Sequence, residues 1–336
     1  DEQLTAIFKY ASQGMGHGHF DRLGILLYNN GNEILQDYGA ARFLNVESKS
    51  GGRYLDENKS WAQQSIAHNT VIVDEKSNFN GDWKVAEKTA PEPIFGDISN
   101  PEIIQISSAV EKNAYAGVEM QRTVALIGEE TPFILDIYTL KSKESHQYDL
   151  NFMFNGHIME TDFKYEPYLT ALSPLGKENG YQHLWNLAES KGNNGISKFT
   201  WLNDSRFYTI STITDGNSKL FFTRLGANDP NFNLRNESGY LIRNANKKDY
   251  TFVSVIEPHG SFDPKLESVQ DPHSKVENIQ ILKQDENYTA VSVSMKNKKN
   301  YTLLFANKKS KADAKHKLSA NGKTYEWKGN YKLITN

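Results

Sequence analysis

The sequence predicts an all-β protein, a large antiparallel β-sandwich with a small C-terminal β-domain. Short apolar runs alternate with polar residues at a period of two, as in residues 207–213, which is typical of strands buried on one face. Helical periodicity over ten or more residues is nearly absent after the first dozen. The 17 Tyr and 17 Phe also favour strands. Together these observations favour a sandwich over a barrel.

The individual elements follow from the same patterns. Residues 4–12 are compatible with one or two turns of helix. Residues 24–37 read as two apolar runs around Asn-Asn-Gly-Asn, a tip that tolerates positive φ, and therefore predict a β-hairpin. Residues 70–74 predict a short buried strand. Further strands are expected at 103–107, 121–127, 133–140, 148–154, 207–213, 220–224, 250–256, 279–282, 289–295 and 301–306.

The length predicts more than one structural unit. A chain of 336 residues exceeds the roughly 250–300 residues that one hydrophobic core usually supports. Residues 258–275 are rich in Gly, Pro and Asp and predict a linker-like turn region. We therefore expect the sandwich over residues 1–257 and the small C-terminal β-domain over 276–336.

Composition excludes several classes of function. Lys plus Arg number 38 and Asp plus Glu 41, so the net charge of -3 offers no basic footprint for nucleic acid. No run approaches the roughly 20 apolar residues of a membrane helix. Cysteine is absent, which excludes disulfides and thiolate ligands. The chain starts at Asp1 with neither an initiator Met nor a signal-peptide pattern, so we expect the interior of a longer precursor, or a processed or trimmed piece.

The chemistry concentrates in a histidine cluster near the start of the chain. His17 and His19 alternate with glycines, and in an extended conformation both imidazoles point to the same side. Asp37 ends the hairpin that follows, and His68 precedes the strand at 70–74. Two imidazoles and a carboxylate suit Zn²⁺ with water in the fourth position. The alternative is a set of hydrogen-bonded polar residues at strand ends.

These segments resemble a known family. GMGHGHFDRLGILLYNNGNEILQDYG, followed by WAQQSIAHNTVIVD, resembles the heparinase II/III-like region of bacterial polysaccharide lyases. The likeness is greatest to the alginate lyases of polysaccharide lyase family 17, the oligoalginate exolyases. It rests on the H-x-H-x-D segment, the D-x-G after the hairpin and H-N-T-V-x-V-D, and extends loosely to FFTRLGANDPNF and SVIEPHG.

The resemblance implies a partner domain. These lyases join an N-terminal α/α toroid to a C-terminal β-sandwich, with the active site between them. This chain contains only the sandwich part, and nothing in it matches the Tyr and the Asn-His pair that the toroid supplies. The resemblance also implies a periplasmic or secreted protein.

The resemblance assigns roles to individual residues. His19, Asp37 and His68 match the ligands of one zinc ion, which we expect to be structural, with a direct Lewis-acid role as the alternative. His17 matches a catalytic-site histidine, and Tyr54 a tyrosine that reaches the substrate cleft. Arg42 matches a basic substrate contact. Apart from the resemblance, His146 is a candidate for a substrate contact or for another hydrogen bond, and Arg224 for a substrate contact or for a surface salt bridge.

The implied reaction is β-elimination from a uronate polymer. A proton leaves C5 beside the carboxylate, whose charge must be neutralised, and the O4 leaving group is protonated. Arg42 and His17 can neutralise that charge through charge-assisted hydrogen bonds, and Tyr54 can act as acid or base. The product carries a 4,5-unsaturated uronyl end.

Three functions therefore remain open. The first is an alginate lyase, exolytic by resemblance, acting on an acidic oligosaccharide or polysaccharide. The second is a glycosaminoglycan lyase for heparin or heparan sulfate, which the net charge of -3 favours less, because a sulfated substrate asks for more basic residues. The third is a catalytically inert, zinc-stabilised carbohydrate-binding sandwich. A homodimer is open as well.

Overall fold

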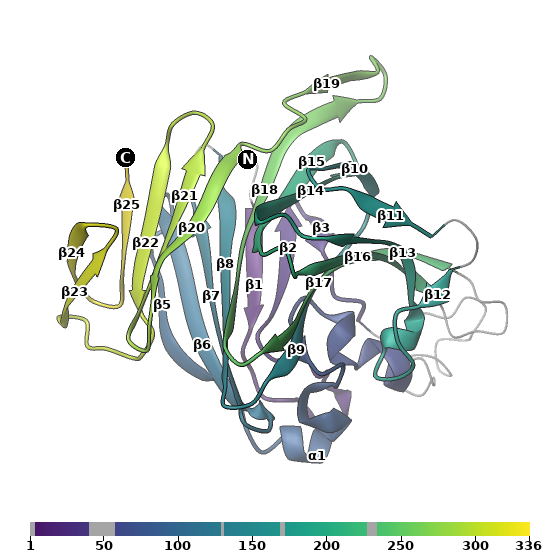
Figure 1. Ribbon diagram of the computed structural model, residues 1–336, viewed down its shortest axis with the longest axis horizontal. Helices are drawn as coiled ribbons and strands as arrows, with labels where there is room; N and C mark the ends of the chain where they lie inside the picture. Colours follow the sequence, from purple (N-terminus) through teal and green to yellow (C-terminus); the bar gives the residue numbers. More distant parts are fainter. Residues whose placement is uncertain (1–3, 40–57, 129–130, 169–171, 227–233) are drawn as a thin grey trace.

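The computed structural model consists of antiparallel β-sheets stacked face to face (Figure 1), and it describes residues 4–39, 58–128, 131–168, 172–226 and 234–336. The predicted all-β antiparallel sandwich is confirmed. The first sheet has ten strands, and its main path runs in the order β1-β2-β3-β9-β17-β16-β13-β11. These strands are β1 (Leu4–Lys9), β2 (Gly24–Asn29), β3 (Asn32–Leu35), β4 (Val71–Val73), β9 (His146–Phe154), β11 (Tyr165–Pro167), β12 (Ser173–Pro174), β13 (Leu184–Lys191), β16 (Lys219–Gly226) and β17 (Leu234–Lys247).

The second sheet has nine strands and covers one face of the first. Its main path is β10-β14-β15-β18-β8-β7-β6-β5, and β19 pairs with the far end of β18. Phe152, Phe199 and Tyr240 belong to the aromatic-rich core between the two sheets. The strands are β5 (Glu92–Asn100), β6 (Ile104–Tyr115), β7 (Val118–Ile127), β8 (Phe133–Ser142), β10 (His157–Thr161), β14 (Gly195–Asn203), β15 (Arg206–Thr214), β18 (Tyr250–Asp263) and β19 (Ser268–Gln270).

A third layer lies on the other face of the second sheet, against β5–β8 in Figure 1. It shares one apolar core with that sheet, in which Ile106 and Val253 pack with Val291 and Phe305. The layer consists of a four-stranded sheet in the order β20-β21-β22-β25 and a separate β23–β24 hairpin. Its strands are β20 (Val276–Gln284), β21 (Tyr288–Met295), β22 (Asn300–Ala306), β23 (Lys315–Ala320), β24 (Lys323–Lys328) and β25 (Tyr331–Thr335).

Two local predictions are wrong. Residues 4–12 do not begin with helical turns, because β1 pairs along its whole length with β2, from Leu4 opposite Asn29 to Lys9 opposite Gly24. These ladder hydrogen bonds override a weak local helical preference. The turn-rich linker over 258–275 is also partly strand, because β18 continues to Asp263 and pairs there with β19. The hairpin predicted at 24–37 is confirmed as β2–β3.

A buried carboxylate joins the third layer to the sandwich. Glu257, on β18, is 2% exposed. It accepts hydrogen bonds from the Ser274 hydroxyl at 2.5 Å and from the backbone N–H groups of Lys275 and Val276 at 3.1 and 3.3 Å. These three donors immediately precede or begin β20, so Glu257 fixes the point where the chain enters the third layer.

Replacing Glu257 by alanine should loosen that junction. The change leaves three donors without their buried acceptor, at about 1–3 kcal/mol for an unsatisfied group. We expect faster amide hydrogen exchange at residues 274–276 and in β20. The matched control is Glu277→Ala, which changes an exposed glutamate on β20 itself. Equal exchange in the two variants would contradict the anchoring role.

Helical segments are few and short, and several gather near the first sheet's N-terminal strands (Figure 1). One group covers the first sheet, where Trp61, Ile66 and Tyr181 form a buried cluster with Leu241 of β17. Within the described residues no helix is long and apolar enough to cross a membrane. The segments are η1 (Met15–His17), η4 (Asn58–Ala62), η5 (Ser65–Ala67), η6 (Asn78–Gly81), α1 (Trp83–Ala86) and η7 (Tyr181–His183).

Candidate metal centre

The loop between β1 and β2 carries the Gly-rich histidine segment. It is not uniformly extended, because residues 15–17 form the single turn η1. Gly14 has φ of 79°, a left-handed conformation that glycine adopts without a Cβ penalty. At Gly18 a Cβ would lie 1.4 Å from the carbonyl oxygen of Gln13, so only glycine fits. The two glycines therefore shape the turn that presents His19.

The other two residues of the cluster come from separate segments. Asp37 follows β3, and His68 lies between η5 and β4. Asn69 connects all three segments through a side chain that is 1% exposed. Its amide nitrogen donates to the carbonyl oxygens of Ile25 and Gln36 at 2.8 and 3.0 Å, and its amide oxygen accepts from the N–H of Met153 at 2.7 Å. Asn69 therefore fixes the spacing between the backbones that carry the cluster.

A buried ion pair from the second sheet supports the same backbones. One guanidinium nitrogen of Arg122, on β7, donates to the carbonyl oxygens of Leu23 and Asn69 at 2.7 and 2.6 Å. The other two guanidinium nitrogens bind the two oxygens of Asp136 on β8, both at 2.7 Å. Arg122 is fully buried and also lies over the ring of Tyr138 at 5.0 Å. The core between the sheets thus holds the loops of the cluster in place.

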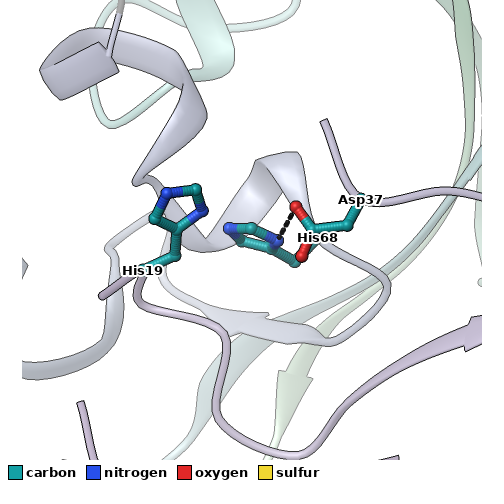
Figure 2. Close-up of side chains that lie close together, drawn as sticks. All are labelled: His19, Asp37 and His68. Carbon is teal, nitrogen blue, oxygen red and sulfur yellow. Dashed lines mark ion pairs between the residues drawn. The ribbon is translucent and has the colours of Figure 1, made fainter. Parts of the chain in front are cut away.

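His19, Asp37 and His68 converge as Figure 2 shows, with one candidate ligand atom from each lying within 4.8 Å of the others. Nδ1 of His68 lies 3.4 Å from Oδ1 of Asp37, and the rings of His19 and His68 have centroids 5.2 Å apart. A distance of 3.4 Å is long for a charge-assisted hydrogen bond.

The electrostatics of the three groups are strongly coupled. Burial, followed by the neighbouring His68, lowers the pKa of His19 to about 4. Burial also disfavours protonation of His68, but the carboxylate of Asp37 outweighs it and raises the pKa of His68. Burial alone would raise the pKa of Asp37, yet His68 and then Lys9 hold it well below its usual range. Near neutral pH the cluster therefore offers a neutral imidazole and a carboxylate.

The donor set fits a metal ion. Nε2 of His68 is buried and has no hydrogen-bond partner among the described residues, an arrangement that costs free energy unless another group compensates it. Two imidazoles and one carboxylate are the ligand types that Zn²⁺ takes in proteins. His19, Asp37 and His68 are therefore the residues that would hold a metal ion.

His17 lies beside the cluster. With His19 and Asp37 it lines a pocket of about 250 Å³, together with Lys9, Ala11, Ser12, Gln13, Gly18, Asp21, Arg22 and Gly39. The guanidinium of Arg22 is already hydrogen-bonded, because it donates to the carbonyl oxygens of Ala86 and Thr89, both at 2.7 Å, and to that of Ala11. The pocket therefore brings the predicted catalytic histidine next to two predicted ligands.

Four predicted site residues remain. Tyr54 and Arg42 fall outside the described residues. His146 starts β9, where Nδ1 contacts Oδ2 of Asp74 at 2.7 Å, and Arg224 on β16 donates to the carbonyl oxygen of Asn236 at 2.9 Å. Neither side chain lines the pocket. Their predicted substrate contacts stay predictions.

Sequence reasoning missed three residues that shape the site, namely Lys9, Asn69 and Arg122. Asn69 follows His68 within the H-N-T-V-x-V-D motif, so its position was a usable signal. Nothing in the local sequence distinguishes Lys9 or Arg122, because each acts on segments that are distant in the chain.

Comparison with solved structures defines the class of fold. A heparinase III gene product matches with a TM-score of 0.61 and 12% identity, and the match covers 90% of this chain and 39% of that chain. The heparan sulfate lyase HepC from Pedobacter heparinus matches with a TM-score of 0.58 and 11% identity, covering 92% of this chain and 40% of its own. The fold is thus one found within polysaccharide lyases.

Comparison with sequences gives the family. The model described as heparinase II/III-like, C-terminal, matches residues 1–266, and the chain belongs to this family. The chain is 40% identical over 332 residues to the exo-oligoalginate lyase of Saccharophagus degradans, covering 97% of this chain and 45% of that protein. It is 41% identical over 326 residues to the alginate lyase of Stenotrophomonas maltophilia, covering 96% and 43%. The chain therefore spans less than half the length of these curated relatives.

Proposed function

We propose that this chain is the β-sheet part of a polysaccharide lyase that cleaves alginate oligosaccharides exolytically by β-elimination. The observation that carries the proposal is the identity of 40–41% over nearly the whole chain with proteins named exo-oligoalginate lyase and alginate lyase. The pocket that joins His17 to the candidate metal centre supports it.

The residues of this chain contribute to the reaction in distinct ways. His17 lines the pocket and can hydrogen-bond the uronate carboxylate, which makes the C5 proton easier to remove. Arg42 adds a second cation to that carboxylate, and Tyr54 transfers a proton as acid or base. A bound zinc ion would crosslink the loops that carry His19, Asp37 and His68. We propose this structural role, through which the orientation of His17 is maintained.

The rest of the active site lies in the part of the relatives that this chain does not span. We propose an N-terminal α/α toroid as that part, supplying the opposite wall of the cleft. The substrate would then contact both walls, and we expect no turnover by this chain alone. We also propose a periplasmic or secreted location, where an acidic polysaccharide is accessible.

A glycosaminoglycan lyase is the second candidate. The shared fold with a heparan sulfate lyase favours it, although an identity of 11% supports the fold alone. The net charge of -3 favours an unsulfated substrate. We therefore place alginate first.

The test is turnover by the full-length protein that contains this chain. Alginate oligosaccharides should release the near-ultraviolet chromophore of a 4,5-unsaturated uronyl end, and heparin should not. His17→Ala should lower kcat by about 10²–10³, the usual cost of losing one charge-stabilising donor. The matched control is His157→Ala, which changes an exposed histidine on β10.

Each outcome separates the candidates. Turnover of heparin but not alginate would favour the second candidate. Binding of uronates without turnover would favour an inert carbohydrate-binding sandwich. Absence of the chromophore with alginate, heparin and heparan sulfate would contradict the lyase proposal.

A further inference from the structure

One ammonium group contacts two carboxylates at the edge of the candidate metal centre. Lys9, the last residue of β1, lies with Nζ 3.2 Å from Oδ2 of Asp37 and also contacts Oδ2 of Asp21. The side chains of Asp21 and Asp37 are 17% and 16% exposed, and that of Lys9 is 35% exposed. The three charges therefore form a partly buried cluster on the wall of the pocket.

The two carboxylate oxygens of Asp37 face different partners. Oδ1 faces His68 and accepts the N–H of Gly39 at 3.0 Å, whereas Oδ2 faces Lys9. Oδ1 is thus the oxygen directed toward the other candidate ligands. A carboxylate held in this way can bind an ion through one oxygen, while its other oxygen accepts a hydrogen bond from the protein.

Asp21 has the chemistry of a fourth ligand but does not occupy that place. It lines the same pocket as His19 and Asp37, yet it is outside the group whose ligand atoms lie within 4.8 Å of one another. Its carboxylate is engaged by Lys9 instead. A zinc site with four protein ligands is closed, whereas a site with three keeps one position for water or another oxygen ligand.

We propose that Lys9 keeps the metal centre open by holding Asp21 away from the ion, so that a fourth position is left for water or a small carboxylate. This inference rests on the proposed metal site. With neutral imidazoles, Lys9, Asp21 and Asp37 together carry one net negative charge, so a divalent ion leaves the centre with one net positive charge. That charge attracts an anion to the open position.

Removing the charge of Lys9 should close the site. In Lys9→Met the side chain keeps its length but releases Asp21, which then becomes the fourth ligand. In the full-length protein we expect the Kd for Zn²⁺, measured by chelator competition, to fall by about tenfold or more, because the ion gains a fourth ligand that carries a negative charge. In the cobalt-substituted protein, acetate and azide should perturb the visible absorption of the wild type and leave that of Lys9→Met unchanged.

Two further variants isolate the cause. Lys9→Arg keeps the charge and should behave as wild type. Lys9→Met combined with Asp21→Asn should restore the anion response, because the released carboxylate is no longer present. These two readouts depend on the coordination of the ion and are unaffected by a purely structural role of Lys9.

The outcomes are distinct. Unchanged zinc affinity and an unchanged anion response in Lys9→Met would overturn the inference while leaving the metal site intact. Weaker zinc binding by Lys9→Met would overturn it as well, because Lys9 would then support the site by orienting Asp37 and the released Asp21 would not be acting as a fourth ligand. A wild-type protein that binds neither zinc nor cobalt would overturn the metal site and this inference together.

Discussion

Replacing His68 by alanine is expected to remove the metal and lower the thermal stability at the same time. His68 is 3% exposed and is one of three side chains that converge from separate segments. Because the ligands are far apart in the unfolded chain, the free energy of metal binding contributes to the free energy of folding. At a free zinc concentration a thousandfold above Kd, that contribution is about 4 kcal/mol.

The measurement combines elemental analysis with thermal unfolding. The wild type should contain about one zinc per chain, and chelation should lower its Tm. His68→Ala should contain none, and its Tm should not respond to zinc or chelator. The matched control is His273→Ala, because His273 is 67% exposed and its ion pair is with the exposed Glu160. An unchanged Tm after metal removal from the wild type would contradict a structural ion.

Replacing Arg122 by methionine is expected to destabilise both the sandwich and the metal centre. Removing one partner of a buried ion pair costs about 3–5 kcal/mol, because the remaining charge of Asp136 is left uncompensated. The change also releases the carbonyl oxygens of Leu23 and Asn69, which lie beside the segments that carry His19 and His68. We therefore expect a weaker affinity for zinc in addition to the lower free energy of unfolding.

Denaturant unfolding at fixed zinc, with and without chelator, checks this expectation. The double variant Arg122→Met with Asp136→Leu should regain part of the stability, since no unpaired charge remains. It should not regain the zinc affinity, because the carbonyl contacts are still absent. Lys317→Met, which breaks an exposed pair with Glu326, should change stability by only about 0.5 kcal/mol. A similarly small effect of Arg122→Met would contradict the supporting role.

The general architecture was predictable because strand patterns are local. The period-two alternation predicted many of the strands in both large sheets, and the Asn-Asn-Gly-Asn tip predicted the β2–β3 hairpin. The first strand was mistaken for helix because six residues carry too little periodicity, and its pairing with β2 decides its structure. The extension of β18 beyond Pro258 was missed for a similar reason, since Gly and Pro predict turns unless a neighbouring strand pairs with them.

The histidines and the aspartate of the candidate site were predictable because they lie in short sequence motifs. The glycines around His17 and His19, together with the family resemblance, pointed to the cluster that the structure assembles with Asp37 and His68. The supporting contacts are long-range: Arg122 reaches Leu23 across 99 positions of sequence. A single sequence does not show which distant residues are in contact. The contacts of Arg122 and Lys9 could therefore be identified only in the folded structure.

The shared core of the second and third sheets has a consequence for how this family is divided. The family model ends at residue 266, before β20 begins at Val276. A protein cut at that boundary would lose Val291 and Phe305 and leave Ile106 and Val253 uncovered on a broad apolar surface. Such surfaces promote aggregation. The end of the family model is therefore not a limit at which this polypeptide can be shortened without a risk of aggregation.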